Sequence, residues 1–365
     1  MPIREKSFRI GSGRYLQEKG ILKSIDQEVL RIGKKPFIIG GKTALSITCK
    51  IIETSLEKSG LEYEIYKHAG SCNEEDAERL SEYAKNNGFD VIVGVGGGVI
   101  MDFAKLIGDF AKLPVINVPT SCATCAAYTP LSVRYTKDGR TVGSKHFENE
   151  VCGVIADTEI ISTQPPRLLL SGVFDALAKY IEIKQRFSEE TETYPIGLDW
   201  AYVMSKRSFS ELTKKTEKCI EDMKNGEITD TVDQVIFATI AATGVISGIA
   251  RGSNQCAIAH KFYEATRALY FEESKEYLHG EIVGIGLLLQ NHFNNELSGN
   301  DFLLSLMNKY NMPANVFNIG ITPTEEAKEK YYEKLKSGSA IDENNKEELK
   351  KLREGLVNRS SKNGQ

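Results

Sequence analysis

Two histidines and one aspartate stand in surroundings that suit a catalytic metal. Asp175 interrupts the otherwise apolar run Gly-Val-Phe-Asp-Ala-Leu-Ala, His260 follows Cys-Ala-Ile-Ala, and His279 precedes Gly-Glu at the expected start of a helix. A buried carboxylate without a partner is costly, so we expect a cation near Asp175. Two imidazoles and one carboxylate leave a coordination position open, as a catalytic metal requires. Each residue alone also fits a plain role as a helix cap or a satisfied core residue.

A run of three glycines, residues 96–98, is a second candidate site. It separates the apolar segment 91–95 from residues 99–111, which have helical spacing. Glycines let backbone N–H groups approach a pyrophosphate, and the start of the following helix attracts an anion. The run is not the G-x-G-x-x-G fingerprint, so a purely steric role stays open. On the helix, Asp102 could contact the cofactor or could be an acid near the helix start that the helix dipole stabilises. Lys105 could lie on the solvated face of the helix.

The end of the first expected strand bears on the choice of cofactor. Dinucleotide sites that prefer NAD usually place a carboxylate there for the ribose 2′-hydroxyl. This chain has Gly40-Gly41-Lys42 instead. We therefore expect NAD(H), NADP(H) or both.

The cysteines predict little chemistry of their own. Cys122 and Cys125 have the spacing of a redox pair or half of a zinc site, but no second such pair completes a structural site. We interpret them as small residues in a tight loop. Seven cysteines without a recognisable secretion signal favour reduced thiols.

The composition narrows the class of protein. The chain has 365 residues, 41% of them hydrophobic and 26% charged, with a formal net charge of -4. Such a chain offers no positive field for nucleic acid or acidic lipid, and we find no uninterrupted apolar run that would span a bilayer. We expect a cytoplasmic protein that works on small molecules.

Short apolar runs alternate with helical segments between residues 36 and 118. Strands are predicted at 37–39, 62–67, 91–95 and 114–118, and helices at 43–58, 73–86 and 99–111. Strand, helix and strand at this spacing indicate βαβ units and a parallel sheet. A β-hairpin over the edge of that sheet is predicted from residues 131–142, with its turn at 137–140.

Strand signals nearly vanish from about residue 167. Helical spacing dominates residues 203–225, 231–247 and 281–297. The chain is charged and low in aromatic residues from about residue 337, and its last residues are expected to fray. We predict an α/β domain over residues 1–163 and an all-α domain over residues 164–365.

The candidate motifs occur together in a fixed order. Val-Gly-Gly-Gly-x-x-x-Asp-x-x-Lys, Pro119-Thr120, Asp175 in Asp-Ala-Leu-Ala-Lys, His260 in Ala-Ile-Ala-His and His279 in Leu-His-Gly-Glu follow one another. This set resembles the iron-containing alcohol dehydrogenase superfamily, in particular its glycerol dehydrogenase branch. The resemblance implies a Rossmann-like N-terminal domain, a helical C-terminal domain, and a divalent metal held by Asp175, His260 and His279.

The resemblance also bears on the metal and on the cofactor contacts. Zinc is usual in the glycerol dehydrogenase branch, although the three ligands suit Fe²⁺ as well. Many superfamily members have another histidine four residues after the aspartate; here Lys179 stands there, and the glycerol dehydrogenase branch also lacks that histidine. Ala123 replaces a serine of the cofactor set. The positions expected to contact the cofactor are Gly41, Gly96, Gly97, Gly98, Val99, Asp102, Thr120, Thr129, Leu131 and Tyr135.

One departure from the branch concerns the substrate. Glycerol dehydrogenases carry an aspartate that contacts the polyol, and Cys125 stands at that position. A thiol cannot accept hydrogen bonds from two hydroxyls as a carboxylate does. The surrounding segment looks more like the hydroxycarboxylate dehydrogenase subgroup, which acts on 2-oxo acids. Arg134 and Arg251 are candidate partners for a substrate carboxylate, with a plain surface role as the alternative.

These observations predict a metal-dependent oxidoreductase. It is expected to transfer a hydride between NAD(P)(H) and the CH–OH or C=O group of a small alcohol, a glycerol-like polyol or a 2-hydroxy or 2-oxo acid, and to form a homo-oligomer. Two alternatives stay open: a non-redox lyase of the dehydroquinate synthase type and a catalytically inactive nucleotide-binding protein.

Overall fold

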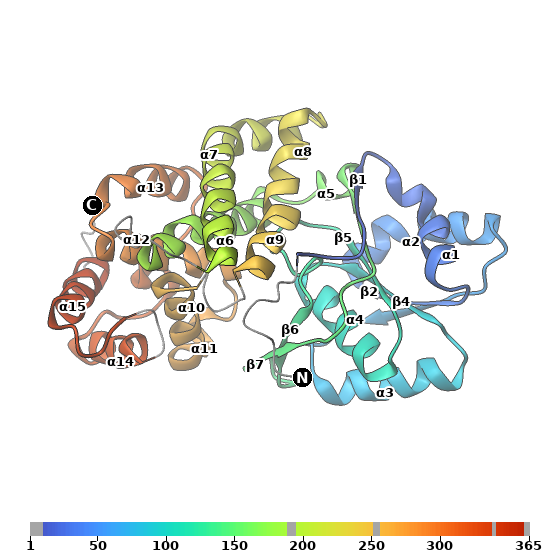
Figure 1. Ribbon diagram of the computed structural model, residues 1–365, viewed down its shortest axis with the longest axis horizontal. Coiled ribbons are helices and arrows are strands. Elements are labelled where there is room, and N and C mark those ends of the chain that lie inside the picture. Colours follow the sequence, from blue (N-terminus) through green and yellow to red (C-terminus); the bar gives the residue numbers. More distant parts are fainter. Residues whose placement is uncertain (1–9, 188–194, 251–255, 338–340, 361–365) are drawn as a thin grey trace. The chain divides into compact units, whose positions relative to one another are not determined.

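The computed structural model describes residues 10–187, 195–250, 256–337 and 341–360 (Figure 1). The chain forms two compact units. The first, here called the sheet unit, comprises Ile10–Leu169 and Lys215–Val245. The second, the helical unit, comprises Leu170–Lys214 and the described residues from Ile246 onward. The division at residues 163 and 164 stays a prediction.

The sheet unit is built on six parallel strands. Their order is β1-β8-β5-β4-β2-β3, which confirms the predicted parallel sheet. The strands are β1 (Tyr15–Glu18), β2 (Pro36–Gly41), β3 (Glu64–His68), β4 (Val91–Gly96), β5 (Val115–Pro119) and β8 (Gly153–Asp157). The sequence interpretation missed β1 and β8. The first is polar and short, and the sheet defines it as a strand only through its pairing with β8.

Helices cover both faces of this sheet, so its central strands β4 and β5 are buried along their whole length. Along β2, Phe37 and Ile39 belong to one buried cluster, whereas Ile38 belongs to the other. The helical elements that precede the hairpin or follow β8 are η1 (Ile21–Ser24), α1 (Ile25–Ile32), α2 (Lys42–Lys58), α3 (Glu74–Asn86), α4 (Gly98–Ala111) and α5 (Thr158–Ile161). The side chain of Asn73 caps α3 by accepting a hydrogen bond from the Asp76 amide.

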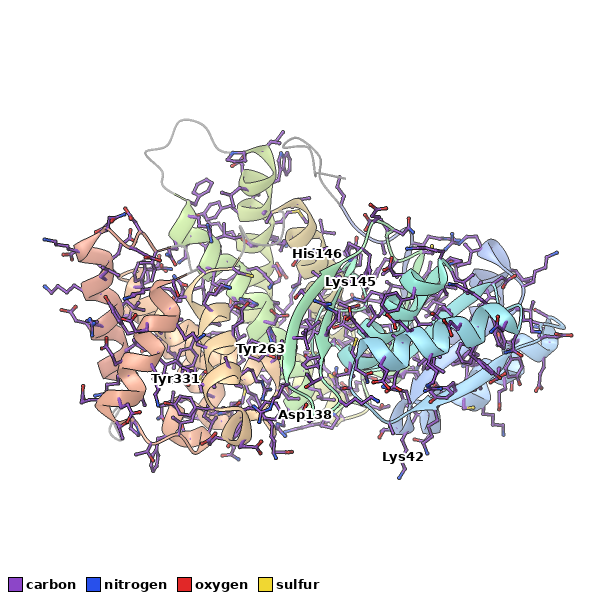
Figure 2. The ribbon with its side chains drawn as sticks, turned by 90° about the horizontal axis from the view of Figure 1, so that it is seen from below. Lys42, Asp138, Lys145, His146, Tyr263 and Tyr331 are labelled. Carbon is purple, nitrogen blue, oxygen red and sulfur yellow. The ribbon has the colours of Figure 1, made fainter. Side chains whose placement is uncertain are left out.

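The predicted hairpin exists, but it is longer than expected. Strands β6 (Leu131–Tyr135) and β7 (Thr141–His146) form a separate antiparallel sheet that shares no ladder with the parallel one. Figure 2 shows Asp138 at its turn and Lys145 and His146 at the far end of β7. After Val142 the strand contains only Gly143 and three consecutive polar residues, so no alternating apolar pattern marks its second half.

Every regular element in the described residues after Asp157 is a helix, as predicted. The next ones are α6 (Pro166–Arg186), α7 (Ile196–Lys224), α8 (Asp230–Phe237), the π-helical turn η2 (Ala238–Ala242) and α9 (Thr243–Ile249). The stretch Asp230–Ile249 is long and apolar enough to cross a membrane, a run that the sequence interpretation did not find. Because 67% of it is buried, it has the character of a core helix.

The helical unit packs α10 and α12 against the last two helices of the chain in one buried cluster. Its remaining elements are α10 (Ile258–Leu269), α11 (Phe271–Ser274), α12 (His279–Phe293), η4 (Leu297–Gly299), α13 (Asn300–Lys309), η5 (Val316–Ile319), α14 (Glu325–Lys336) and α15 (Lys346–Ser360). Residues 346–360 are helical, whereas the final residues, expected to fray, lie outside the described part of the chain. Ring stacking of Phe262 on Tyr331, whose centroids are 4.9 Å apart, joins α10 to α14.

Candidate metal centre and nucleotide turn

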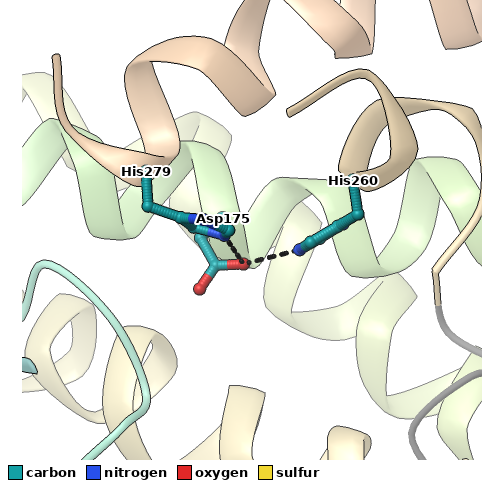
Figure 3. A group of neighbouring side chains, drawn as sticks. All are labelled: Asp175, His260 and His279. Atoms are coloured by element: carbon teal, nitrogen blue, oxygen red, sulfur yellow. Dashed lines mark hydrogen bonds and ion pairs between the residues drawn. The ribbon is translucent and has the colours of Figure 1, made fainter. Parts of the chain in front are cut away.

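Asp175, His260 and His279 converge within the helical unit (Figure 3). One carboxylate oxygen of Asp175 lies 3.2 Å from Nε2 of His260 and 3.7 Å from Nε2 of His279. The ligand atoms of the three residues all lie within 4.8 Å of one another. Asp175 and His260 are buried, and the side chain of His279 is 28% exposed. This donor set fits a divalent metal with an open position.

Two glycines set the spacing of the helices that carry these ligands. A Cβ atom on Gly286 would lie 2.6 Å from the Ala259 carbonyl oxygen, so α12 approaches α10 more closely than any other residue would permit. A Cβ on Gly280 would lie 1.9 Å from the Ser171 carbonyl oxygen. The Gly280 amide donates to the Ser171 hydroxyl at 3.1 Å. The start of α12, with His279, is therefore held against α6, which carries Asp175.

Glu182 orients His260 from the side opposite the other ligands. Its carboxylate accepts hydrogen bonds from the amides of Ala257 at 2.7 Å and His260 at 2.9 Å, and its second oxygen contacts Nδ1 of His260. A carboxylate on Nδ1 leaves Nε2 to face a metal, the usual arrangement around metal-bound histidines. The sequence interpretation missed Glu182. Its signal was the spacing i, i+4, i+7 of Asp175, Lys179 and Glu182, which places all three on one face of α6.

Lys179 brings a positive charge into the same group. Its side chain is only 4% exposed, and its Nζ lies 3.1 Å from the Asp175 carboxylate and 3.3 Å from Nε2 of His260. The lysine that replaces a superfamily histidine thus contacts two of the three candidate ligands.

The charges around the triad shift its pKa values in different directions. Burial alone would raise the pKa of Asp175, but Lys179 and the two histidines outweigh it and hold that pKa well below its usual value. Burial opposes protonation of His260, yet Glu182 raises the pKa of His260 well above normal. Burial lowers the pKa of His279. The two histidines of the triad therefore differ in the direction of their pKa shifts.

The glycine run lies at the turn between β4 and α4 in the sheet unit. Strand order reverses between β2 and β4, because β3 lies on one side of β2 and β4 on the other. Open α/β sheets bind ligands at the carboxyl ends of strands at such a point. Gly41 ends β2, and Gly97 precedes α4 without a side-chain cap. A Cβ on Gly97 would have Ser121 Oγ, 3.7 Å away, as its nearest contact, so this position has room for a ligand.

The interpretation of Lys105 as a solvated residue was wrong. Lys105 is buried, and its ammonium donates to the carbonyls of Ala126 at 2.7 Å, Thr129 at 3.0 Å and Leu131. Asp102 pairs with Lys105 at 2.8 Å and accepts from the Val133 amide at 3.0 Å. Burial raises the pKa of Asp102, with Lys105 opposing it. The pair anchors the segment that carries Thr129 and Leu131; a direct cofactor contact by Asp102 stays a prediction.

The other expected cofactor positions lie on the same turn and the segment that follows. Val99 is 44% exposed, Thr129 is buried, and the Thr120 amide donates to the Gly96 carbonyl at 3.0 Å. Gly41, Gly98, Ala123, Leu131 and Tyr135 are partly buried. Their contacts with a cofactor stay predictions.

The residues expected near the substrate have contacts within the protein. Cys125 is partly buried, and its carbonyl accepts from the Tyr128 amide at 2.9 Å. Arg134 pairs with Glu74 at 2.7 Å, and Arg251 lies outside the described residues. All seven cysteines are free thiols, and burial raises the pKa of Cys122, which agrees with a tight loop rather than a redox pair.

Comparison with known proteins decides the family. The iron-containing alcohol dehydrogenase model matches residues 12–156. Hydroxycarboxylate dehydrogenase A of Escherichia coli (strain K12) is 30% identical over 274 residues, which are 74% of this chain and 73% of that protein. The chain belongs to the iron-containing alcohol dehydrogenase family. Glycerol dehydrogenase of Pseudomonas putida is 28% identical over 313 residues, 85% of this chain and 84% of that protein.

Solved structures of the family share the fold. A probable glycerol dehydrogenase from Sinorhizobium meliloti 1021 superimposes with a TM-score of 0.80 at 21% identity, covering 97% of this chain and 98% of that one. Glycerol dehydrogenase from Schizosaccharomyces pombe gives a TM-score of 0.79 at 23% identity, covering 97% and 91%. The predicted fold class is confirmed. As a member of this family, the chain is a metal- and nicotinamide-dependent oxidoreductase that acts on CH–OH groups of small molecules.

Proposed function

We propose that Asp175, His260 and His279 hold the catalytic metal and that the glycine turn of residues 96–98 binds the pyrophosphate of the cofactor. The convergence of three ligand atoms within 4.8 Å carries this proposal. When bound, the metal supplies Lewis-acid polarisation of the substrate oxygen. Zinc is the favoured ion, with Fe²⁺ as the alternative, because carboxylate and imidazole ligands suit both.

Each residue of the centre has a separate task in this proposal. Asp175 and the two imidazoles supply the ligand atoms, and Glu182 keeps Nδ1 of His260 occupied so that Nε2 faces the metal. The anchored segment from Ala126 to Val133 gives the cofactor a fixed surface beside α4. Bound nicotinamide would supply the hydride donor or acceptor at its C4 atom, and that chemistry belongs to the cofactor.

We propose that the enzyme accepts NAD(H) and also NADP(H). No carboxylate ends β2, where Gly41 stands, and a Cβ there would meet nothing closer than 3.5 Å. The exposed Lys42 follows at the start of α2 and offers a cation for a 2′-phosphate.

For the substrate we propose a small 2-hydroxy acid and its 2-oxo acid. A thiol at Cys125 in place of a carboxylate removes a negative charge and an acceptor for polyol hydroxyls. The 30% identity to hydroxycarboxylate dehydrogenase A supports the same substrate class. A glycerol-like polyol is the second candidate, because glycerol dehydrogenases match at 28–30% identity.

A substrate panel tests the proposal. Glycerol, propane-1,2-diol, 2-oxobutanoate and 2-oxoglutarate are each assayed with both cofactors by the absorbance of NAD(P)H. We expect net oxidation of reduced cofactor with a 2-oxo acid. Turnover of the polyols alone would favour the second candidate. No net cofactor consumption with any substrate would favour the lyase or the inactive binding protein.

We also propose a cytoplasmic homo-oligomer. The free thiols and the buried Asp230–Ile249 stretch agree with the first part. The oligomer rests on the family resemblance, and size-exclusion chromatography with light scattering measures it.

A further inference from the structure

Lys179 contacts the same atoms that would bind the metal. Its Nζ lies 3.1 Å from the Asp175 Oδ1 atom and 3.3 Å from the His260 Nε2 atom. These two atoms lie 3.2 Å apart, and the Asp175 Oδ1 atom also lies 3.7 Å from Nε2 of His279. An ammonium carries three donors and no lone pair, so in this form it cannot serve as a ligand itself.

A metal ion bound to the triad would lie close to this ammonium. Zinc lies about 2.0–2.2 Å from carboxylate and imidazole ligands. An ion bound to Asp175 Oδ1 would therefore lie within about 5 Å of Nζ, given the 3.1 Å contact. The lysine side chain is 4% exposed and the aspartate side chain 6%, so little water screens the repulsion between two cations there.

The two carboxylates on α6 have different partners. Asp175, Lys179 and Glu182 share one face of the helix, and Glu182 binds the His260 ring and two backbone amides. Asp175 pairs with Lys179 at 3.1 Å, so a metal bound to the Asp175 carboxylate would disturb this ion pair.

We propose that Lys179 is an internal competitor for the divalent metal. Its ammonium takes the metal's place on Asp175 and His260 in the metal-free protein, and it has to leave those two atoms when the metal binds. Lys179 thereby sets the metal affinity below that of the same triad without the lysine. This inference rests on the metal site proposed above.

The test measures zinc binding rather than turnover. Metal-free wild-type protein and the Lys179→Met variant compete with a chromophoric chelator for zinc. Methionine keeps most of the side-chain length and removes the charge. We expect zinc affinity to rise by at least about tenfold in this variant, since like charges at this distance in a buried site cost more than that. The Lys184→Met variant is the matched control: Lys184 lies on the same helix but pairs with Glu296, so its loss leaves affinity unchanged.

Two further measurements keep the outcomes distinct. Thermal melts with and without zinc show whether Lys179→Met folds, and the zinc-induced rise in melting temperature should exceed that of the wild type. If the variant does not fold, Lys179→Leu takes its place, with the same increase expected, because leucine also removes the charge and adds no ligand atom. Unchanged affinity in the folded variant would overturn the inference, and weaker affinity would identify Lys179 as a supporting group or ligand. In an Asp175→Asn variant, undiminished zinc binding would instead refute the metal site itself and with it the proposed function.

Discussion

Glu182 offers the sharpest test of how the centre is assembled. In a Glu182→Gln variant, the side-chain oxygen still accepts from the Ala257 and His260 amides, but the amide NH₂ then faces Nδ1 of His260. A donor there forces the imidazole to carry its proton on Nε2, the atom that would bind the metal. Flipping the amide instead points two donors at two backbone N–H groups. Either orientation penalises the metal-bound state.

The expected magnitude follows from the contacts that are lost. Replacing a carboxylate behind a ligating histidine costs about 10–100-fold in metal affinity. Gln keeps the two backbone hydrogen bonds but loses the attraction of the carboxylate for the His260 ring, so the metal-free protein should lose less stability than in Glu182→Ala. Glu182→Ala leaves both amides unpaired and should destabilise the protein by roughly 2–6 kcal/mol.

Zinc competition with a chelator and chemical unfolding measure the two effects separately. Glu296→Gln serves as the control, because it removes a carboxylate of the same unit that pairs with Lys184. If Glu182→Gln binds zinc within about twofold of the wild type, Glu182 does not orient His260 for a metal, and the reasoning is wrong.

Three other predictions concern the sheet unit and the buried thiols. In Gly97→Ala the new Cβ would meet only Ser121 Oγ at 3.7 Å, so the variant should keep its stability but bind nucleotide at least about tenfold more weakly. In Gly94→Ala the new Cβ would lie 2.6 Å from that of Ala104, so this variant should lose about 1–3 kcal/mol of stability. Equal unfolding midpoints for the two variants would contradict the packing argument. Lys105→Met leaves Asp102 buried without its cation, so the free energy of unfolding in urea should fall by about 3–5 kcal/mol. A fluorescence titration should also show weaker nucleotide binding. Wild-type values in both measurements would show that the segment 126–133 needs no such anchor. Burial raises the pKa of the Cys72, Cys122 and Cys219 thiols, so these thiols lose their protons at lower pH in the unfolded state than in the folded state. The free energy of unfolding should therefore fall above about pH 9, by roughly 4 kcal/mol per pH unit for the three thiols together. A flat stability profile from pH 8 to 10 would refute this.

The sequence predicted those features that leave a local pattern. The runs around β2, β4 and β5 are apolar because helices bury both faces of the sheet, and the glycines of 96–98 mark the turn that follows β4. Asp175 was found because it interrupts an apolar run, and His260 and His279 because they follow it in the motif order that resembles the family.

The parts that escaped prediction depend on contacts distant in sequence. Strand β1 is defined by its pairing with β8, 135 or more residues later in the chain, and no local pattern reveals it. Lys105 has the spacing of a solvated lysine, yet three carbonyls from a later segment surround its ammonium. Glu182 and Lys179 acquire their roles only when α10 brings His260 to the face of α6.

The most direct test of the account is a zinc titration of metal-free protein that follows bound metal and NAD(P)H turnover together. The proposed centre predicts one zinc per chain, with activity rising in proportion and reaching its plateau at one equivalent, and loss of both in the His260→Ala variant. Full turnover in metal-free protein, or wild-type zinc binding in the folded His260→Ala variant, would contradict the claim that Asp175, His260 and His279 hold the catalytic metal.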